Sequence, residues 1–502
     1  MHVDVVVVGG GGSGLAAAIG ASENGASVVL LEKNPVLGGT TACSVGSITA
    51  AGTPHQRRMG IVDSPAEHFQ DMELFSRKYA SRPDNDVLRR VLTENVPETV
   101  RWLAGLGVEF FGPMEEPPHR KPRMHNAVPN SRAYIFHLER CARRLGVRIL
   151  AESRARRLLF EGGRVTGVEF EKGADKRETV HARLGIVLAA GDYSADREMK
   201  RRLISEAVAD IQPVNPTSTG DGQRMALEVG ARIVNGDLFG GGLRFVPPPR
   251  PSWISKLPPW RWCMRPVNFA LRYAPHLIVR PLVMGFLTTV LVPDQGLFEA
   301  GAILINKRGE RFADETSPMV FELASQPDGV AYIVFDEALA RKFSSWPHFI
   351  STAPGFAYTY LSDYERNRPD LFHRAPTLDK LAFKLRADPA KLIDAVAQYN
   401  RSGAGEAAPA AALARGRRST LGVGSYYALG PVKNYVSFTD GGLAVSERLE
   451  VLGADDRPIP GLFAAGSTGQ GGLLLKGHGH HLGWAFTSGR LAGKSAASRN
   501  GG

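Results

Sequence analysis

Residues 4–14 read DVVVVGGGGSG, an Ala-rich segment follows, and residues 28–32 read VVLLE. This order predicts a strand, a glycine-rich turn, a helix and a second strand, which together form the βαβ unit that holds a dinucleotide. In such a unit Gly9 permits the tight turn, Gly11 lets the backbone approach a pyrophosphate, and Gly14 lets the helix lie close to the sheet. A glycine-rich turn alone is weak evidence, but here all four parts occur in register.

The start of the predicted helix and the end of the second strand offer polar groups to the same ligand. Backbone N–H groups at Gly12 and Ser13 would face the phosphates, where the helix dipole adds partial positive charge. Glu32 closes the second strand and is placed to accept hydrogen bonds from a ribose diol.

The residues after Glu32 decide between the two common dinucleotides. Lys33 follows the acid directly, and the chain then reaches a small loop that contains Gly39, Thr40 and Thr41. This loop has no side-chain bulk that would keep a flavin ribityl chain away. It therefore favours FAD over NAD.

From this loop onward the chain resembles the fumarate reductase and 3-ketosteroid dehydrogenase group of FAD-dependent flavoproteins. The motifs that carry the resemblance read IVLAAGDY at 186–193, TGDG at 219–222, GAILIN at 301–306 with GERF at 309–312, and GLFAAG at 461–466. The resemblance implies further FAD contacts from Ala190, Gly191, Asp221, Gly466, Ser467 and Leu482. We expect the FAD to be non-covalent, because the N-terminal third has no His-Ala-Thr-type attachment site.

The order of the motifs predicts an α/β protein in which one domain is inserted into another. A Rossmann-like FAD-binding domain would be discontinuous, with parts at residues 1–236 and 371–502, because the Ala-Ala-Gly segment lies beyond residue 460. An α+β substrate-capping domain would occupy residues 237–370. Apolar spacing between Leu378 and Tyr399 predicts paired helices that lead back to the first domain. The active site is expected at the junction.

Composition agrees with a large enzyme. The chain has 502 residues, 43% of them hydrophobic, and only three cysteines, too few and too scattered for a disulfide framework or a metal site. The N-terminus begins in a predicted strand with Asp4 and lacks the regions of a signal peptide. We therefore expect a cytoplasmic protein.

A one-sided charge distribution marks residues 238–293. This stretch contains seven Lys or Arg residues and no Asp or Glu, and it holds Trp253, Trp260 and Trp262. Basic residues interleaved with Trp and aliphatic side chains fit a segment that lies on an anionic membrane surface without spanning it. The alternative is a Pro-rich insertion in the capping domain with a solvated basic face. Nucleic acid is not expected as a partner, because the prolines and aliphatic residues suit a phosphate track poorly.

The residues that would hold a small dicarboxylate are replaced in this chain. Fumarate reductases of this group carry an Arg before the Gly-Ala-Ile strand, a His in a His-His-Thr-Met-Gly-Gly stretch, and an Arg before the final Leu-Gly. The corresponding positions here look like Phe298, residues 437–442 and His481. Without two arginines a dianion is a poor substrate, so the pocket is expected to be apolar. The tyrosines of the steroid enzymes are also absent, since Met319 and Leu475 or Lys476 stand at their positions.

The sequence GHGHHLG at 477–483 is the replacement that offers chemistry. Gly479 resembles the residue whose backbone N–H binds a substrate carbonyl oxygen. Either His478 or His480 could move a proton at neutral pH, with His481 beside them, or these imidazoles could only hydrogen-bond the flavin or line the loop. Two phenols are further acid–base candidates or plain core residues, namely Tyr427 and Tyr435. No metal is expected, because no further acid or Cys lies nearby.

Together these features predict an FAD-dependent oxidoreductase that acts on a CH–CH bond next to a carbonyl of a lipophilic small molecule, similar to a 3-ketosteroid dehydrogenase. One alternative is an ene-reductase or dehydrogenase of an unsaturated carboxylic acid. Another is a membrane-associated electron-transfer flavoprotein. The sequence does not identify the electron acceptor, and an anionic membrane surface is the further partner it indicates.

Overall fold

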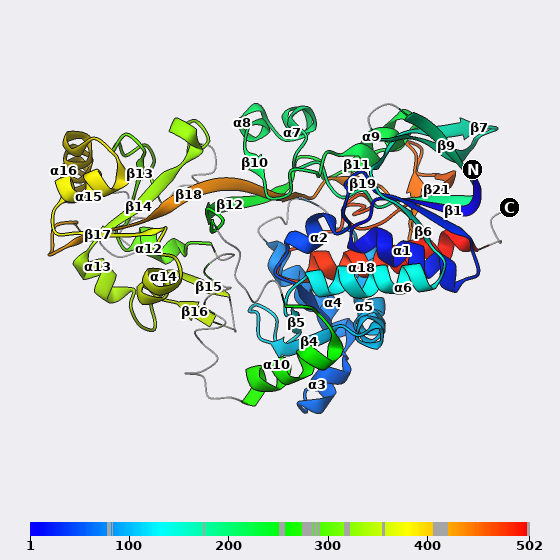
Figure 1. The fold of residues 1–502 in the computed structure, drawn as a ribbon, viewed down its shortest axis with the longest axis horizontal. Coiled ribbons are helices and arrows are strands. Elements are labelled where there is room, and N and C mark those ends of the chain that lie inside the picture. Colours follow the sequence, from blue (N-terminus) through cyan, green and yellow to red (C-terminus); the bar gives the residue numbers. More distant parts are fainter. Residues whose placement is uncertain are drawn as a thin grey trace.

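The computed structural model describes residues 1–77, 82, 84–173, 176–249, 257–273, 284, 288, 292–315, 322–353, 357–404 and 420–498. Figure 1 shows a larger lobe, which holds both chain ends, and a smaller lobe, the capping domain. Strand β18 (Tyr426–Thr439) runs from the smaller lobe to the larger one.

The larger lobe is built on a sheet whose central strands are parallel. Its order is β20-β21-β9-β1-β2-β6, and β7 and β8 extend it as an antiparallel pair beside β9. Val5 to Val8 on β1 are all buried, as expected for a parallel strand covered on both faces. The strands are β1 (His2–Val8), β2 (Val28–Leu31), β6 (Arg148–Leu150), β7 (Ser153–Glu161), β8 (Arg164–Lys172), β9 (Lys176–Leu188), β20 (Glu450–Leu452) and β21 (Pro458–Ala464).

Two long helices cover this sheet and touch each other closely. A Cβ on Gly493 of α18 would lie 2.0 Å from the carbonyl oxygen of Ala17 on α1, so the small residues allow the helices to meet. Helices of this lobe are α1 (Gly12–Glu23), α2 (Gly39–Cys43), α5 (Asp86–Leu106), α6 (Arg132–Arg144), α7 (Arg197–Leu203), α8 (Glu206–Ala209), α9 (Asp221–Glu228) and α18 (His480–Ala497). A short two-stranded sheet joins β11 (Ile233–Val234) to β19 (Gly442–Leu443).

A three-stranded antiparallel sheet lies below the larger lobe in Figure 1. Its order is β3 (Ser47–Thr49), β5 (Met124–Val128), β4 (Glu109–Met114). Three helices lie with it, α3 (Pro54–Arg58), α4 (Pro65–Ser76) and α10 (Arg261–Tyr273).

The capping domain is built on a sheet of order β10-β18-β14-β13, with β12 and β17 also paired to β18. Its strands are β10 (Gln212–Pro213), β12 (Phe239–Phe245), β13 (Ile303–Asn306), β14 (Ala331–Asp336) and β17 (Phe372–Ala375), and a separate pair is β15 (Ser351–Ala353) with β16 (Ala357–Thr359). Its helices are α12 (Gln295–Glu299), α13 (Glu337–Lys342), α14 (Leu361–Asn367), α15 (Leu378–Leu385), α16 (Pro389–Ala404) and the 3₁₀ turn η3 (Pro327–Gly329).

The structure moves one domain boundary predicted from the sequence. The paired helices expected between Leu378 and Tyr399 are present as α15 and α16, but they belong to the capping domain and not to the returning part of the other domain. Their buried side chains, among them Leu381 and Leu392, share one hydrophobic core with Leu429 on β18. The capping domain therefore extends well past residue 370, the boundary predicted from the sequence.

The basic stretch at 238–293 does not form one unit. Its first part is β12, a strand of the capping sheet, and its middle part is α10, which packs against β4 of the larger lobe. Trp253 and the segment 274–283 lie outside the described residues. No helix within the described residues combines the length and the apolar character that crossing a bilayer requires.

Candidate active site

A pocket opens where β1 and β9 end, and three glycines shape its floor. Gly9 has φ +108°, and a Cβ there would lie 2.4 Å from the Ala189 carbonyl oxygen. A Cβ on Gly14 would lie 1.8 Å from the Gly9 carbonyl oxygen, so only glycine seats α1 this close to β1. Around Gly11, by contrast, the nearest atom to an added Cβ is the Gly38 carbonyl oxygen at 3.9 Å. The space in front of Gly11 is therefore pocket.

Both predicted and unpredicted residues line this pocket. The predicted ones are Gly9, Gly11, Gly12, Ser13, Glu32, Lys33, Gly39, Thr40, Thr41, Ala190, Gly191, Asp221 and Ser467. Those that sequence reasoning missed include Asn34, Ser153, Arg154, Asn215, Thr217 and Ser218. The last three directly precede the TGDG motif, so their position could have pointed to them, whereas Arg154 on β7 has no local signal.

Glu32 binds the loops around the pocket. Its Oε2 accepts a hydrogen bond from the Gly10 N–H at 2.6 Å, and its Oε1 accepts from the N–H and the Nδ2 of Asn34, both at 2.8 Å. The carboxylate thus fixes the glycine-rich turn. It also remains part of the pocket wall, where a ribose is expected.

Lys33 and Asp221 join the βαβ unit to the TGDG loop. Lys33 Nζ lies 2.7 Å from Asp221 Oδ2, and Arg154 Nη2 lies 3.0 Å from Asp221 Oδ1. Burial pushes the pKa of Asp221 upward, but the ammonium of Lys33 and the guanidinium of Arg154 outweigh burial and hold it at about 2. Asp221 is therefore a permanent anion that organises two cations beside the pocket.

Three predicted cofactor residues lie behind the pocket wall and act on their neighbours. Gly14 seats α1, as described above. The Gly466 N–H donates to Ser488 Oγ at 2.9 Å, and its carbonyl accepts from Trp484 Nε1 at 3.1 Å. Leu482 is buried in the core of the larger lobe.

Comparison with known proteins assigns the pocket. The model of the FAD binding domain family matches residues 4–249 and 282–474. The chain belongs to this family. FAD, the cofactor predicted from the sequence, is thereby confirmed, and so is the predicted class of fold.

Curated relatives support the same group. An NADH:fumarate oxidoreductase of Klebsiella pneumoniae is 27% identical over 99% of this chain and 48% of its own length. An NADH:acrylate oxidoreductase of Vibrio harveyi is 27% identical over 99% of this chain and 50% of its length. A vinyl phenol reductase of Lactiplantibacillus plantarum is 28% identical over 98% of this chain and 96% of its length. The chain thus spans about half the length of the first two.

Solved structures show the same fold. An open conformation of a flavocytochrome c3 fumarate reductase has a TM-score of 0.74 at 24% identity, over 99% of this chain and 78% of its own. A 3-ketosteroid Δ1-dehydrogenase from Sterolibacterium denitrificans has a TM-score of 0.67 at 19% identity, over 99% of both chains. The resemblance inferred from the motifs is confirmed.

The residues present fit FAD. The open space at Gly11 adjoins the N-terminus of α1, where N–H groups and the helix dipole favour a pyrophosphate. Thr41 Oγ1 accepts the Gly12 N–H at 3.2 Å, and Asn215 Nδ2 donates to Thr40 Oγ1 at 2.9 Å and to Ser218 Oγ at 3.0 Å. Small polar side chains therefore cover the pocket side along which a ribityl chain would run.

The turn before α18 holds Gly479 in a special conformation. Gly479 caps α18 with φ +84°, and a Cβ there would lie 2.7 Å from the Thr49 backbone nitrogen. Its carbonyl accepts the Gly483 N–H at 2.9 Å, but its own N–H donates to no acceptor within the described part of the chain. This N–H is available to a ligand oxygen.

His478 anchors the turn at the surface. Its backbone N–H and its Nδ1 both lie 2.6 Å from Glu116 Oε1. The hydrogen bond to the buried Glu116 carboxylate raises the pKa of His478, although partial burial opposes this. The side chain is 60% exposed. A side chain that faces solvent and is held by Glu116 suits a structural role better than proton transfer inside the site.

His480 belongs to a buried group of three histidines and does not line the FAD pocket. Its Nε2 lies 3.2 Å from Nε2 of His68 on α4, and His119 completes the group, with ligand nitrogens within 4.8 Å of one another. Burial lowers the pKa of all three, that of His119 to about 2. The three imidazoles are therefore neutral.

Their hydrogen-bond partners fix the tautomers. The Lys476 carbonyl can only accept, so His480 Nδ1 carries a hydrogen and its Nε2 accepts from His68 Nε2. The Arg123 guanidinium can only donate, at 3.0 Å to His119 Nδ1, so neutral His119 carries its hydrogen on Nε2. Two of the three converging nitrogens thus lack a lone pair for a metal. This arrangement agrees with the expectation of no metal, which stays a prediction.

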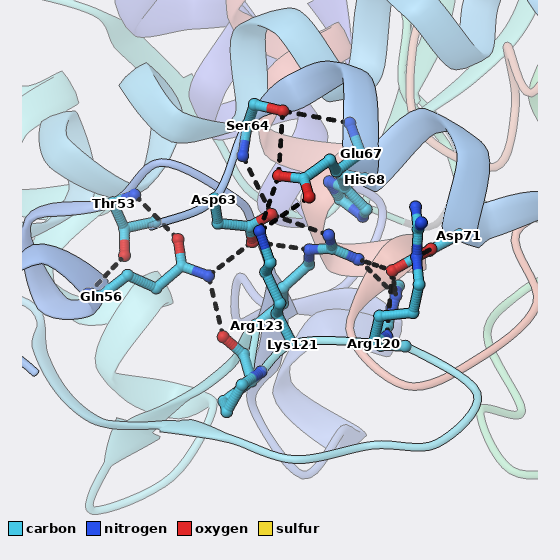
Figure 2. Close-up of polar contacts among 12 residues, drawn as sticks. Thr53, Gln56, Asp63, Ser64, Glu67, His68, Asp71, Arg120, Lys121 and Arg123 are labelled. Carbon is cyan, nitrogen blue, oxygen red and sulfur yellow. Dashed lines mark hydrogen bonds and ion pairs between the residues drawn. The ribbon is translucent and has the colours of Figure 1, made fainter. Parts of the chain in front are cut away.

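A buried ion network holds the histidine group in place. Figure 2 shows Arg123 between Asp63 and Asp71, with His68 above them. The distances are 2.7 Å from Arg123 Nε to Asp63 Oδ2 and 2.5 Å from Arg123 Nη1 to Asp71 Oδ2. Gln56 Nε2 donates to Asp63 Oδ2 at 2.7 Å and so ties α3 to the same network.

These buried histidines predict acid lability. An unfolded His binds a proton near pH 6.5, but folded His119 does so only near pH 2, so the unfolded chain binds more protons as the pH falls. The free energy of unfolding should fall below pH 6.5, by up to about 1.4 kcal/mol per pH unit for each such group. Thermal unfolding between pH 7.5 and 5.5 measures this slope.

His119→Phe removes one such group, so the free energy of unfolding of this variant should fall less steeply with pH, by up to about 1.4 kcal/mol per pH unit. His478→Gln has the opposite sign, because the raised pKa of His478 stabilises the folded protein at low pH, so its removal should steepen the slope. Equal slopes in the parent and in His119→Phe would show that His119 does not contribute.

His481 faces the capping domain. Its ring packs against Phe438 of β18 in a tilted arrangement, with 4.2 Å between centroids, and its Nε2 lies 4.0 Å from Asp440 Oδ1. The Leu475 carbonyl accepts a hydrogen bond from the ring, and Nε2 has no hydrogen-bond partner, so the hydrogen is on Nδ1 and the lone pair on Nε2. Burial lowers the pKa of His481 to about 4. Of the three histidines, it is the one poised at the junction as a neutral base.

Asp440 and Lys476 form a buried ion pair behind His481. Lys476 Nζ lies 2.5 Å from Asp440 Oδ2, and Gln470 Nε2 donates to Asp440 Oδ1 at 3.0 Å. Asp440 is fully buried, and these partners satisfy both of its carboxylate oxygens. The pair fixes the side of the site against which His481 lies.

Strands β12 and β18 pair at the junction between the two lobes, and we call this pair of strands the roof of the site. Gly240 pairs with Phe438, Gly242 with Tyr435 and Arg244 with Lys433, and opposite residues of an antiparallel pair share one face. The Phe438 ring fills the space over Gly240, where a Cβ would lie 2.2 Å from it, but nothing lies within 4 Å of an added Cβ on Gly242. Tyr435 therefore borders open space.

Arg244 on this face has no counterion. Within the described residues no carboxylate or other acceptor binds its guanidinium, and burial lowers its pKa. A half-buried cation without an acid is costly unless a ligand supplies the negative charge. Sequence reasoning counted Arg244 only as part of a basic surface.

Tyr427 is not brought to the site. It stacks on Phe335 at 5.8 Å and belongs to the hydrophobic core of the capping domain. At about 3.3 Å per residue it lies roughly 40 Å along β18 from Thr439. The structure favours its core role, one of the two readings left open by the sequence.

Proposed function

We propose that the protein is an FAD-dependent oxidoreductase that adds or removes hydrogen across a carbon–carbon bond next to a carbonyl group, in a substrate with a large apolar body. The relatives are named as oxidoreductases or reductases of fumarate, acrylate and vinyl phenol, all of which contain a carbon–carbon double bond. The observation that carries the proposal is His481, a neutral imidazole packed against Phe438 where the resembled fumarate reductases have an arginine.

Gly479, His481 and Phe438 have separate roles in the proposed reaction. The Gly479 N–H binds the substrate carbonyl oxygen and stabilises the negative charge that develops there. The imidazole of His481 takes the proton from the carbon next to that carbonyl, or returns it in the reverse direction. Its Nε2 is buried beside Asp440 in this structure, so the ring must turn for the substrate to reach that atom. FAD, when bound, accepts or supplies the hydride. Phe438 covers the Gly240 side of the site and limits the access of water to the reacting atoms there.

Arg244 favours a second candidate within the same reaction type. Its unpaired guanidinium would bind one carboxylate, so an unsaturated carboxylic acid with an apolar body fits the roof as well. Fumarate fits less well, because its second carboxylate would face Phe438 and the neutral His481. The site thus accommodates at most one anionic end.

An anaerobic flavin titration tests the proposal. Three substrate classes should be compared, namely neutral lipophilic enones and ketones, monocarboxylic acids with the same carbon skeleton, and fumarate. Bleaching of the oxidised flavin by a saturated ketone or acid, or reoxidation of the reduced flavin by its unsaturated partner, supports the proposal. Fumarate as the fastest substrate contradicts it. Flavin that responds to a redox protein or a quinone but to none of these compounds supports the electron-transfer alternative.

Arg244→Leu separates the two substrate candidates. A hydrogen-bonded charge pair contributes about 1.5–3 kcal/mol, so the Kd of a carboxylic acid should rise roughly 10- to 100-fold. The matched neutral ketone serves as the control, and its Kd should stay within about twofold. Flavin difference spectra measure both constants. An unchanged Kd for carboxylic acids would show that Arg244 does not bind the substrate carboxylate.

A further inference from the structure

Helix α10 presents aromatic side chains to solvent. Met264 and Asn268 face the protein, where Asn268 Nδ2 donates to the Phe110 carbonyl of β4 at 2.9 Å. On the opposite face Trp262 is 71%, Phe269 65% and Tyr273 70% exposed. Such a run of exposed aromatic residues on one helix face marks an interaction surface.

Helix α3 adds to the same region. It packs, like α10, against β4, and both lie at the lower end of the molecule in Figure 1. Met59 and Val62, which follow α3, are exposed to 53% and 85%. Arg57 and Arg58 at the end of the helix are exposed as well. We call the exposed residues of α3 and α10, with Trp260 and Val62, the α3/α10 face.

The charge of the α3/α10 face is positive. Arg57, Arg58, Arg261 and Arg265 are exposed on it. Glu109 on β4 is the acid that reaches two of them, at 3.1 Å from Arg261 Nε and 3.5 Å from Arg265 Nε. One carboxylate against four guanidinium groups leaves an excess of positive charge beside the aromatic rings.

We propose that the α3/α10 face binds the surface of an anionic lipid bilayer, with α10 lying in the headgroup layer. Aromatic and aliphatic side chains would enter the boundary of the acyl chains while the arginines contact lipid phosphates. α10 is 13 residues long, too short to span the hydrocarbon core. The proposal rests on this face alone and is independent of the reaction assigned above.

The side chains of the α3/α10 face favour a lipid bilayer over a nucleic acid as its partner. A nucleic-acid surface would need cations along a phosphate track, whereas Met59, Val62 and Phe269 offer groups that avoid water. Charge alone would give weak, fully salt-sensitive attachment. Rings beside guanidinium groups give a bilayer both an electrostatic and an apolar contribution.

Co-sedimentation of the FAD-loaded protein with vesicles tests the proposal. We expect binding to vesicles with 30% phosphatidylserine, weak binding to pure phosphatidylcholine, and a loss of binding as salt rises. Trp262→Ser with Phe269→Ser should reduce the bound fraction at every salt concentration. Arg57→Gln with Arg58→Gln should lower the partition coefficient roughly tenfold or more at low salt, since each cation near the surface contributes about fivefold.

A control pair comes from the far end of the capping domain. Phe383 is 83% exposed on α15 and Lys380 is exposed beside it, so Phe383→Ser with Lys380→Gln removes the same side-chain types elsewhere. This control should bind like the parent. FAD content and flavin reduction should be unchanged in every variant. The proposal is overturned if the parent ignores phosphatidylserine vesicles, if both α3/α10 variants bind like the control, or if duplex DNA competes fully with the vesicles.

Discussion

Gly11→Val is expected to give a folded protein without FAD. Nothing of the protein lies closer than 3.9 Å to a Cβ at this position, so the first side-chain atom of the valine does not clash with its own chain. It projects instead into the space that the pyrophosphate needs, next to the N-terminus of α1. Flavin absorbance after gel filtration should be near zero, while thermal unfolding still shows one cooperative transition at a lower temperature.

Two control variants make this result specific. Gly105→Ala changes another glycine with open space around it, in helix α5, and should keep FAD. Gly14→Ala places its Cβ 1.8 Å from backbone and should lower the yield of folded protein itself. A yellow Gly11→Val protein that is fully loaded with FAD would contradict the assignment of this pocket to FAD. The parent should also release its flavin on acid precipitation, as expected for non-covalent FAD.

His481→Gln should slow flavin reduction by roughly 10²- to 10⁴-fold without loss of FAD. Glutamine keeps the size and part of the hydrogen bonding of histidine but cannot take the proton. Stopped-flow reduction by a substrate found in the titration measures the rate. Because the pKa of His481 is lowered to about 4, the parental rate of proton removal should not fall through this group between pH 8 and pH 6.

The neighbouring histidines serve as controls for this prediction. His478→Gln should change the rate only a few-fold, since His478 faces solvent and Glu116. His480→Gln should act mainly on stability, because it disrupts the buried contact with His68. If His481→Gln reduces flavin at the parental rate, the proton passes elsewhere, and Tyr435 beside Gly242 becomes the candidate.

Much of the pocket lining could be predicted from the sequence because those residues lie close together along the chain. Turn, helix start and terminal acid lie within residues 4–41, and each glycine has one steric task that a spacing can reveal. The contacts of the histidine-rich turn are not local. His68 meets His480 from 412 residues away, and no spacing connects two such positions.

The roles within the GHGHHLG turn also depended on partners that the sequence does not pair. Glu116, His68 and Phe438 come from three different elements and draw three nearby histidines in three directions. The sequence favoured His478 or His480 for proton transfer, and only these contacts favour His481. The capping boundary was missed for a similar reason, because apolar helix spacing shows that α15 and α16 bury a face but not against which sheet.

Strand β18 connects the capping domain directly to the larger lobe. It is continuous from the capping core to Thr439, where the Asp192 carboxylate of the larger lobe accepts the Thr439 N–H at 2.9 Å and Thr439 Oγ1 accepts the Tyr193 N–H at 3.3 Å. Phe438 is the residue before Thr439, so it lies next to the point where the strand is anchored. A rotation of the capping domain about this point would change how the Phe438 ring contacts His481, and with it the position of the imidazole that we propose to transfer the proton.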